Sequence, residues 1–186
     1  MIKQSQSHAA LLAPLSAPGS ELITLPSSAT LAVKRWGIGT PVLCLHAVGH
    51  GSGDFADLAK RLEHGFELIA LDWPGMGRSP PDGQSVRASH FAALVIESVN
   101  ALGLERPIVI SNSIGGAAAI VAAASAPERF AGLVLCNPGG LGALDAPARF
   151  VIGRMSAFFR AGARGAWWFP RAFAAYYRRL VLTRAP

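Results

Sequence analysis

Between residues 21 and 138 the sequence alternates short apolar runs with longer stretches whose apolar residues recur at helical spacing. Continuous apolar runs are expected for strands that are covered on both faces. Residues 41–47 form such a run, and further strands are expected at 66–72, 107–111 and 130–138. Strands that alternate with helices favour a parallel sheet joined by right-handed crossovers. The sequence therefore predicts an α/β fold with a doubly wound, mostly parallel sheet and helices on both faces.

Composition divides the chain into three segments. Residues 1–20 contain an apolar stretch interrupted by proline and shorter than the roughly 7–15 residues of a secretory signal, so we expect a loose N-terminal arm. Residues 21–145 hold every predicted strand and begin with two, at 21–26 and 30–36, that are expected to form a hairpin. Residues 146–186 are rich in arginine and aromatic residues and show no strand pattern.

Residues 107–127 carry no charge, and their length is close to the ~20 residues of a membrane-spanning helix. The apolar character changes within them, from the β-branched PIVIS to the alanine-rich GGAAAIVAAASA. Because Ser111, Asn112 and Ser113 stand between these two parts, a buried strand followed by a buried helix is expected instead.

The formal net charge of +6 is unevenly distributed along the chain. All 11 acidic residues lie within residues 1–145, whereas residues 146–186 hold eight arginines. The main body is therefore mildly acidic, which argues against a nucleic-acid partner. Cys44 and Cys136 both stand in apolar runs, which predicts buried, unpaired thiols and a cytoplasmic protein.

The sequence Ser111–Gly116, SNSIGG, follows an apolar strand and opens an alanine-rich helix. A tight strand-to-helix turn presents a serine hydroxyl at the carboxyl edge of the sheet, and it requires small residues two positions before and after the serine. Ser111 and Gly115 meet that demand around Ser113. The N–H groups at the start of the helix favour negative charge that develops beside the serine. Alternatively, Ser113 only caps the helix that begins at Ile114.

From residue 30 to residue 145 the sequence resembles the α/β-hydrolase family. The resemblance rests on LHAVGHGSGDF (45–55), DWPGMGRS (72–79) and SNSIGG (111–116), which occur in the family's order. It implies that Ser113 is a nucleophile and that the backbone N–H groups of Val48 and Ile114 form the oxyanion hole. It also implies an ester or similar acyl substrate, with Asp72 in a structural role as a loop cap.

The resemblance implies an acid and then a histidine after the serine in chain order. All five histidines precede Ser113, and only two acids follow it, Glu128 and Asp145. Asn137 occupies the position after the last strand where some relatives place an acid. Acid and base are therefore expected outside this chain, which would end before its core is complete. His50 is a candidate substitute base, since its loop is expected at the same sheet edge as Ser113.

Two interpretations are open for residues 146–186. The resemblance implies the start of a helical cap over a hydrophobic acyl substrate. Alternatively, the arginines and aromatic residues form a basic amphipathic segment that contacts an anionic membrane surface. The spacing of FPRAFAAYYRRL favours packed cap helices.

Two other classes of function are also open. Gly51, Gly53 and Ala56 fit a dinucleotide-binding fingerprint, and Asp72 lies about 20 residues further on. Against that function, Asp54 would repel a pyrophosphate at the start of the helix. A non-catalytic remnant or interaction module would need no missing residue. No cluster has metal-ligand spacing, so neither a metal nor an organic cofactor is expected.

Overall fold

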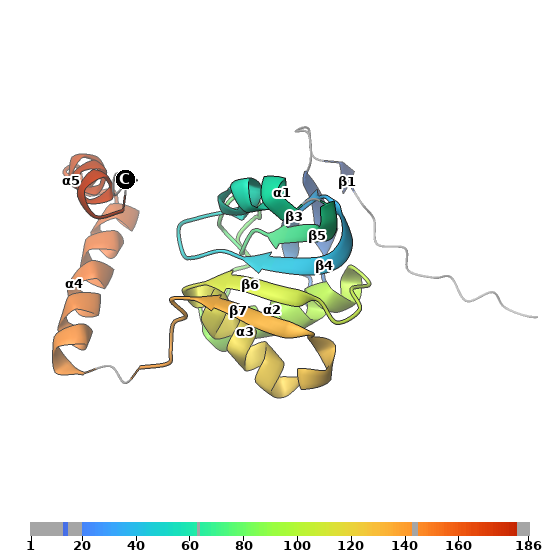
Figure 1. The fold of residues 1–186 in the computed structure, drawn as a ribbon. Coiled ribbons are helices and arrows are strands. Elements are labelled where there is room, and N and C mark those ends of the chain that lie inside the picture. Colours follow the sequence, from blue (N-terminus) through green and yellow to red (C-terminus); the bar gives the residue numbers. More distant parts are fainter. Residues whose placement is uncertain (1–12, 15–19, 63, 143–144, 182–186) are drawn as a thin grey trace, which may run out of the picture. The chain divides into compact units, whose positions relative to one another are not determined.

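The computed structural model describes residues 13–14, 20–62, 64–142 and 145–181, and the chain forms two compact units, residues 1–141 and 142–186 (Figure 1). The first unit contains the sheet and the second is helical.

The first unit is built on a seven-stranded sheet with the order β1-β2-β3-β5-β4-β6-β7. β1 to β3 and the β3–β5 pair are antiparallel, whereas β5, β4, β6 and β7 run parallel. In chain order, the strands β1 to β7 span Ala13–Pro14, Ser20–Thr24, Thr30–Trp36, Ile38–Leu45, His64–Leu71, Ile108–Asn112 and Gly132–Cys136. The sheet is therefore mixed, with the predicted parallel part following an antiparallel entry.

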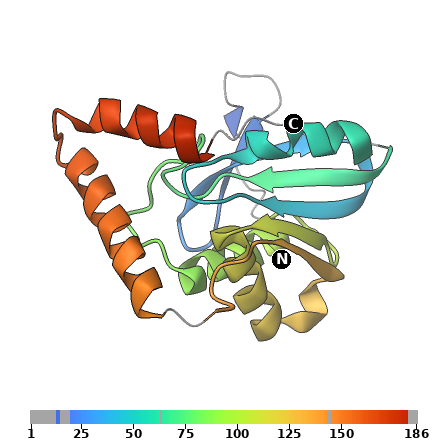
Figure 2. The same ribbon diagram turned by 60° about the vertical axis from the view of Figure 1, so that its left-hand side comes forward.

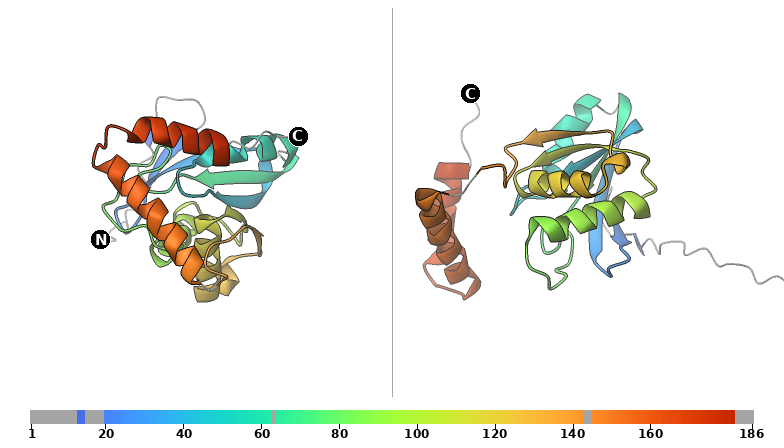
Figure 3. Two further views of the ribbon diagram at one scale, coloured as in Figure 1. Left: turned by 90° about the vertical axis from the view of Figure 1, so that its left-hand side faces the viewer. Right: turned by 90° about the horizontal axis from the view of Figure 1, so that it is seen from below.

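Helices cover both faces of the sheet, as predicted (Figures 2 and 3). The 3-10 turn η1 (Ser52–Phe55) and α1 (Ala56–Leu62) lie on one face. α2 (Ala88–Ala101) and α3 (Ile114–Ser125) lie on the other, and a short 3-10 turn, η2 (Pro127–Arg129), leads from α3 to β7. The sheet is thus doubly wound, with the core divided into two layers.

Alternation along β4 shows how the core is divided. Val42 and Cys44 point into the cluster beneath α1, and Leu43 and Leu45 point into the larger cluster beneath α2 and α3. All four are at most 2% exposed. A strand buried on both faces needs an unbroken apolar run, which accounts for the sequence of β4.

β7 departs from this pattern because it is the last strand of the sheet. Leu133 and Leu135 pack against the large cluster, but Val134 is 49% exposed and Cys136 is exposed. Val134 pairs with Ile110 on the α1 face, and the cluster beneath α1 reaches Ile108 and Ile110 of β6 but includes no residue of β7. The expectation that both cysteines are buried is therefore wrong for Cys136.

The expected hairpin joins β2 to β3 through a tight turn in which Leu25 N–H donates to Ala29 O at 2.8 Å and Ser28 has φ +70°. Of the N-terminal arm, Ala13–Pro14 pairs with β2 as β1. The other residues before Ser20 lie outside the described part of the chain.

The second unit is a pair of helices, α4 (Ala146–Ala163) and α5 (Phe169–Tyr176), followed by the π-helical turn η3 (Tyr177–Val181). Asp145 caps α4 by accepting Ala148 N–H at 2.8 Å. Phe158, Phe159 and Phe169 form the centre of an aromatic cluster between the helices. None of the helices described here has the length and apolar character needed to cross a bilayer.

Candidate active site

Ser113 occupies a sharp turn between β6 and α3. Its φ of +53° and ψ of −113° lie in a region that non-glycine residues rarely adopt. Two backbone hydrogen bonds hold the turn: Ser113 N–H donates to Cys136 O at 3.2 Å, and Gly139 N–H donates to Ser113 O at 2.9 Å. Such strain persists only where the surroundings impose it, and it is frequent at functional sites.

Small residues on both sides of Ser113 permit this turn. A Cβ atom at Gly115 would lie 2.5 Å from Leu45 O, which is too close for any side chain. A Cβ atom at Gly116 would lie 2.7 Å from Pro138 Cβ. Ser111 is buried, and its hydroxyl donates weakly to Val134 O at 3.4 Å. The start of α3 can therefore press directly against β4 and the segment that follows β7.

The loop after β4 emerges at the same edge of the sheet. β4 and β6 are parallel neighbours, with Leu45 opposite Ser111, so Val48 and Ser113 both follow the carboxyl ends of adjacent strands. Among the described residues, neither Val48 N–H nor Ile114 N–H has a hydrogen-bond acceptor. Free N–H groups beside a serine could stabilise an oxyanion.

His46 is a structural residue at the end of β4. It is fully buried, its Nε2 accepts Trp73 N–H at 3.1 Å, and its Nδ1 donates to Ala47 O at 2.7 Å. This arrangement requires the neutral ring. Burial lowers the pKa of His46, against the opposing effects of the Ala47 hydrogen bond and the Asp72 charge. The sequence offered only one signal for this role, the position of His46 directly after a buried strand.

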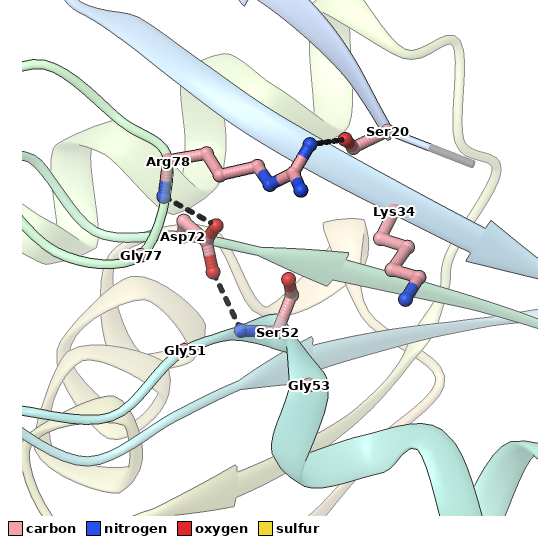
Figure 4. Close-up of a pocket in the computed structure, with 8 residues that line it drawn as sticks. All are labelled: Ser20, Lys34, Gly51, Ser52, Gly53, Asp72, Gly77 and Arg78. Carbon is pink, nitrogen blue, oxygen red and sulfur yellow. Dashed lines mark hydrogen bonds between the residues drawn. The ribbon is translucent and has the colours of Figure 1, made fainter. Parts of the chain in front are cut away.

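Asp72 holds two loops together (Figure 4). Its Oδ1 accepts Ser52 N–H at 2.5 Å and its Oδ2 accepts Arg78 N–H at 2.9 Å. A side chain at Gly77, which has φ +53°, would collide with this carboxylate. Asp72 is 2% exposed and its contacts are those of a loop cap.

Two histidines, His50 and His90, form acid–histidine pairs that do not include Ser113. His50 Nδ1 lies 2.7 Å from Asp54 Oδ2, and both side chains are partly exposed. His90 Nε2 lies 2.7 Å from Asp82 Oδ2, and the His90 side chain is half-buried. His8 lies outside the described residues.

The two acids that follow Ser113 in the sequence have other surroundings. Glu128 is exposed in η2, where Arg129 also lies, and Asp145 caps α4. Asn137, directly after β7, has φ +43°. In the part of the chain that the structure describes, no carboxylate hydrogen-bonds to Ser113.

The glycine pattern that fits a dinucleotide fingerprint has a different use here. Gly51 precedes η1, and Ser52 N–H is bound by Asp72 Oδ1. The acid that would bind a ribose is therefore already engaged with the loop that would bind the pyrophosphate. Among the described residues, no group of three or more potential ligands could hold a metal ion.

Comparison with known proteins gives a consistent result. Residues 40–184 match the sequence model of the alpha/beta hydrolase fold family. A 2-hydroxy-6-oxo-6-phenylhexa-2,4-dienoate hydrolase of Comamonas testosteroni is 33% identical over 112 residues, which cover 58% of this chain and 39% of that protein. A serine hydrolase-like protein of Danio rerio is 37% identical over 104 residues, 55% of this chain and 32% of that one.

Among solved structures, that of a membrane phospholipase A, described as a bacterial virulence factor, aligns with a TM-score of 0.63 and 25% identity. The alignment covers 72% of this chain and 42% of that one. The chain thus spans less than half the length of each of these three proteins.

Proposed function

The chain belongs to the α/β-hydrolase fold family, and we propose that it is the nucleophile-bearing part of a serine hydrolase. Ser113 Oγ would attack the carbonyl carbon of an ester or similar acyl substrate and form a tetrahedral intermediate. A general base would take the proton of Ser113 Oγ during the attack and give it to the leaving alcohol as the intermediate collapses, which leaves an acyl group on Ser113 Oγ. Water would then attack this acyl-enzyme, release the acid and restore the serine.

The observation that carries the proposal is the backbone of Ser113. A residue that only caps a helix has an extended backbone, and its side chain accepts an N–H of the first turn. Ser113 instead has φ +53° and makes no capping hydrogen bond through its side chain. The strained turn favours a hydroxyl that is presented at the edge of the sheet over a simple cap.

Stabilisation of the intermediate is assigned to Val48 and Ile114. Their N–H groups have no acceptor among the described residues, and Ile114 also begins α3. The positive end of the α3 dipole favours negative charge at that position. Preorganised N–H donors of this kind contribute about 3–4 kcal/mol to transition-state stabilisation in serine hydrolases.

The general base and its acid partner are proposed to lie outside residues 1–186. A serine hydroxyl is a weak nucleophile without a base. His50 is the alternative base within this chain, since it follows β4 and is already oriented by Asp54 at 2.7 Å. Its Nδ1 is engaged by Asp54, so its Nε2 would have to accept the proton from Ser113.

A hydrophobic ester or related acyl compound is the proposed substrate class. Two relatives support it by their names, a membrane phospholipase A and a hydrolase of a phenyl-substituted dienoate. We also propose that residues 146–186 begin a helical cap. Peripheral contact with a membrane is the competing role of this segment, supported by its exposed aromatic residues, among them Trp167, which is 84% exposed.

Phosphonylation of the full chain by a fluorophosphonate probe tests the proposal, with imidazole added as a substitute for the missing base. Mass spectrometry of the peptides locates the adduct. We expect slow labelling of Ser113 that imidazole accelerates, loss of labelling in Ser113→Ala, and no change in Ser125→Ala, a serine at the other end of α3. Circular dichroism confirms folding of each variant.

Three outcomes separate the alternatives. Labelling of Ser113 that is fast without imidazole and lost in His50→Gln would assign the base to His50. A folded chain whose Ser113 stays unlabelled with imidazole would contradict the proposal. That last result would favour a non-catalytic module.

A further inference from the structure

A cavity of about 360 Å³ opens in the first unit, and Ser113 is not among the residues that line it (Figure 4). It lies between β2, β3 and the loops that Asp72 joins. Lys34 of β3 pairs with Ala70, which packs beneath α1, so the cavity opens on the α1 face of the sheet. A volume of this size suits a small molecule.

Two cations line the cavity, and neither has a carboxylate partner among the described residues. Lys34 is half-buried, with its Nζ 4.9 Å from the centroid of the Trp36 ring. Arg78 Nη1 donates to Ser20 Oγ at 3.2 Å. Arg35, on the opposite face of β3, differs in that it forms ion pairs with two carboxylates, Glu67 at 2.7 Å and Glu21 at 3.1 Å.

The one acid that lines the cavity, Asp72, makes no ion pair with either cation. Both oxygens of Asp72 accept backbone N–H groups, from Ser52 and Arg78, and the carboxyl group is almost fully buried. Ser52 has its hydroxyl directed into the cavity, where it makes no hydrogen bond with the described residues (Figure 4).

We infer that this cavity binds the phosphate group of a small molecule through Lys34, Arg78 and Ser52. Three separate donor groups match the three acceptor oxygens of a phosphate group better than the two of a carboxylate. The planar guanidinium of Arg78 can offer paired donors to phosphate oxygens, whereas Lys34 acts as a point charge. The hydroxyls of Ser52 and Ser20 supply further donors. The inference is independent of the chemistry proposed for Ser113.

Calorimetric titration of the full chain tests the site, with inorganic phosphate and glycerol 3-phosphate as probes. The titration is made at about pH 7.5, where phosphate is largely dianionic, and chloride at matched ionic strength is the reference. We expect saturable binding that weakens about tenfold or more in Lys34→Gln and in Arg78→Gln, the usual loss for a charge-assisted hydrogen bond. Lys34→Arg should retain binding.

Matched controls remove the same charge elsewhere: Lys60→Gln on α1 and Arg87→Gln before α2 should bind phosphate as the unaltered chain does. If Lys34→Gln fails to fold, Arg78→Gln decides, because Arg78 is exposed and keeps its backbone bond to Asp72. Tighter binding of glycerol 3-phosphate than of phosphate would identify an organic phosphate, and equal binding would identify the free ion. No saturable binding, an effect that chloride reproduces, or unchanged affinity in both variants would overturn the inference.

Discussion

Trp73 is bound to His46 by two hydrogen bonds. The backbone N–H of Trp73 donates to His46 Nε2 at 3.1 Å, and the indole N–H donates to His46 O at 2.8 Å. Both residues are fully buried, and Trp73 also stacks on Phe91 with a centroid distance of 4.3 Å. The pair joins the end of β4 to the loop after β5 and so holds the loop that carries Val48.

Replacement of His46 by leucine tests this link. The variant would leave Trp73 N–H buried without an acceptor, and such a loss costs about 1–3 kcal/mol of unfolding free energy. Burial lowers the pKa of His46 below its ordinary 6.5. Below about pH 6.5 this histidine is therefore protonated to a greater extent in the unfolded chain than in the folded chain. Stability from this residue is therefore full above about pH 6.5 and declines as the pH falls through the folded pKa.

Urea unfolding at about pH 7.5 and pH 5.5 measures both effects. His46→Leu should be less stable at the higher pH and should lose less stability on acidification than the unaltered chain. His64→Leu provides the matched control, since His64 is exposed in β5. Equal pH dependence in the unaltered chain and in His46→Leu would contradict the neutral, buried role of His46.

Gly115→Ala probes the contact between α3 and β4. The added Cβ would lie 2.5 Å from Leu45 O, so backbone must move, and overpacking of this kind costs about 1–3 kcal/mol. Gly132→Ala, where a Cβ would meet no atom within 4 Å, should change stability by less. Thermal unfolding of the two variants compares them directly. Similar stability of both would mean that α3 does not press on β4 as described.

Ser113→Gly separates backbone strain from chemistry. Glycine adopts φ +53° without steric cost, whereas serine stores about 1–3 kcal/mol there. We expect the variant to be at least as stable as the unaltered chain, although an internal glycine usually destabilises. Ser125→Gly, at the last position of α3, should lower the free energy of unfolding by up to about 1 kcal/mol. Urea unfolding measures both variants. A clear loss of stability in Ser113→Gly would show that Ser113 is not strained.

The parallel half of the fold could be predicted because its strands are buried on both faces, and their apolar runs leave few alternatives. Val42 to Leu45 are such a run. The antiparallel entry was partly visible, since a hairpin at Ser27–Ala29 was expected, but the pairing of β3 with β5 is a long-range contact that local pattern does not encode.

The strand-to-helix turn at Ser113 could be predicted from the small residues around it. The structure gives the steric reason, because a side chain at Gly115 would collide with the backbone of β4. Pairings between polar side chains were less accessible. His90 and Asp82 are eight residues apart across an irregular loop, and Lys34 and Arg78 meet only at the cavity between separate elements. Side chains that converge in this way carry no sequence periodicity.

The two cysteines should differ in reactivity, although both stand in apolar runs. Cys44 is fully buried in β4, and burial raises the pKa of its thiol to about 12, so almost no thiolate is available in the folded chain. Cys136 is exposed on the edge strand β7. Titration with a chromogenic disulfide reagent should release about one equivalent of the coloured thiolate per native chain, and about two equivalents per chain in denaturant. Cys136→Ser should abolish the native reaction and Cys44→Ser should leave it intact, whereas equal rates for the two thiols would contradict the burial of Cys44.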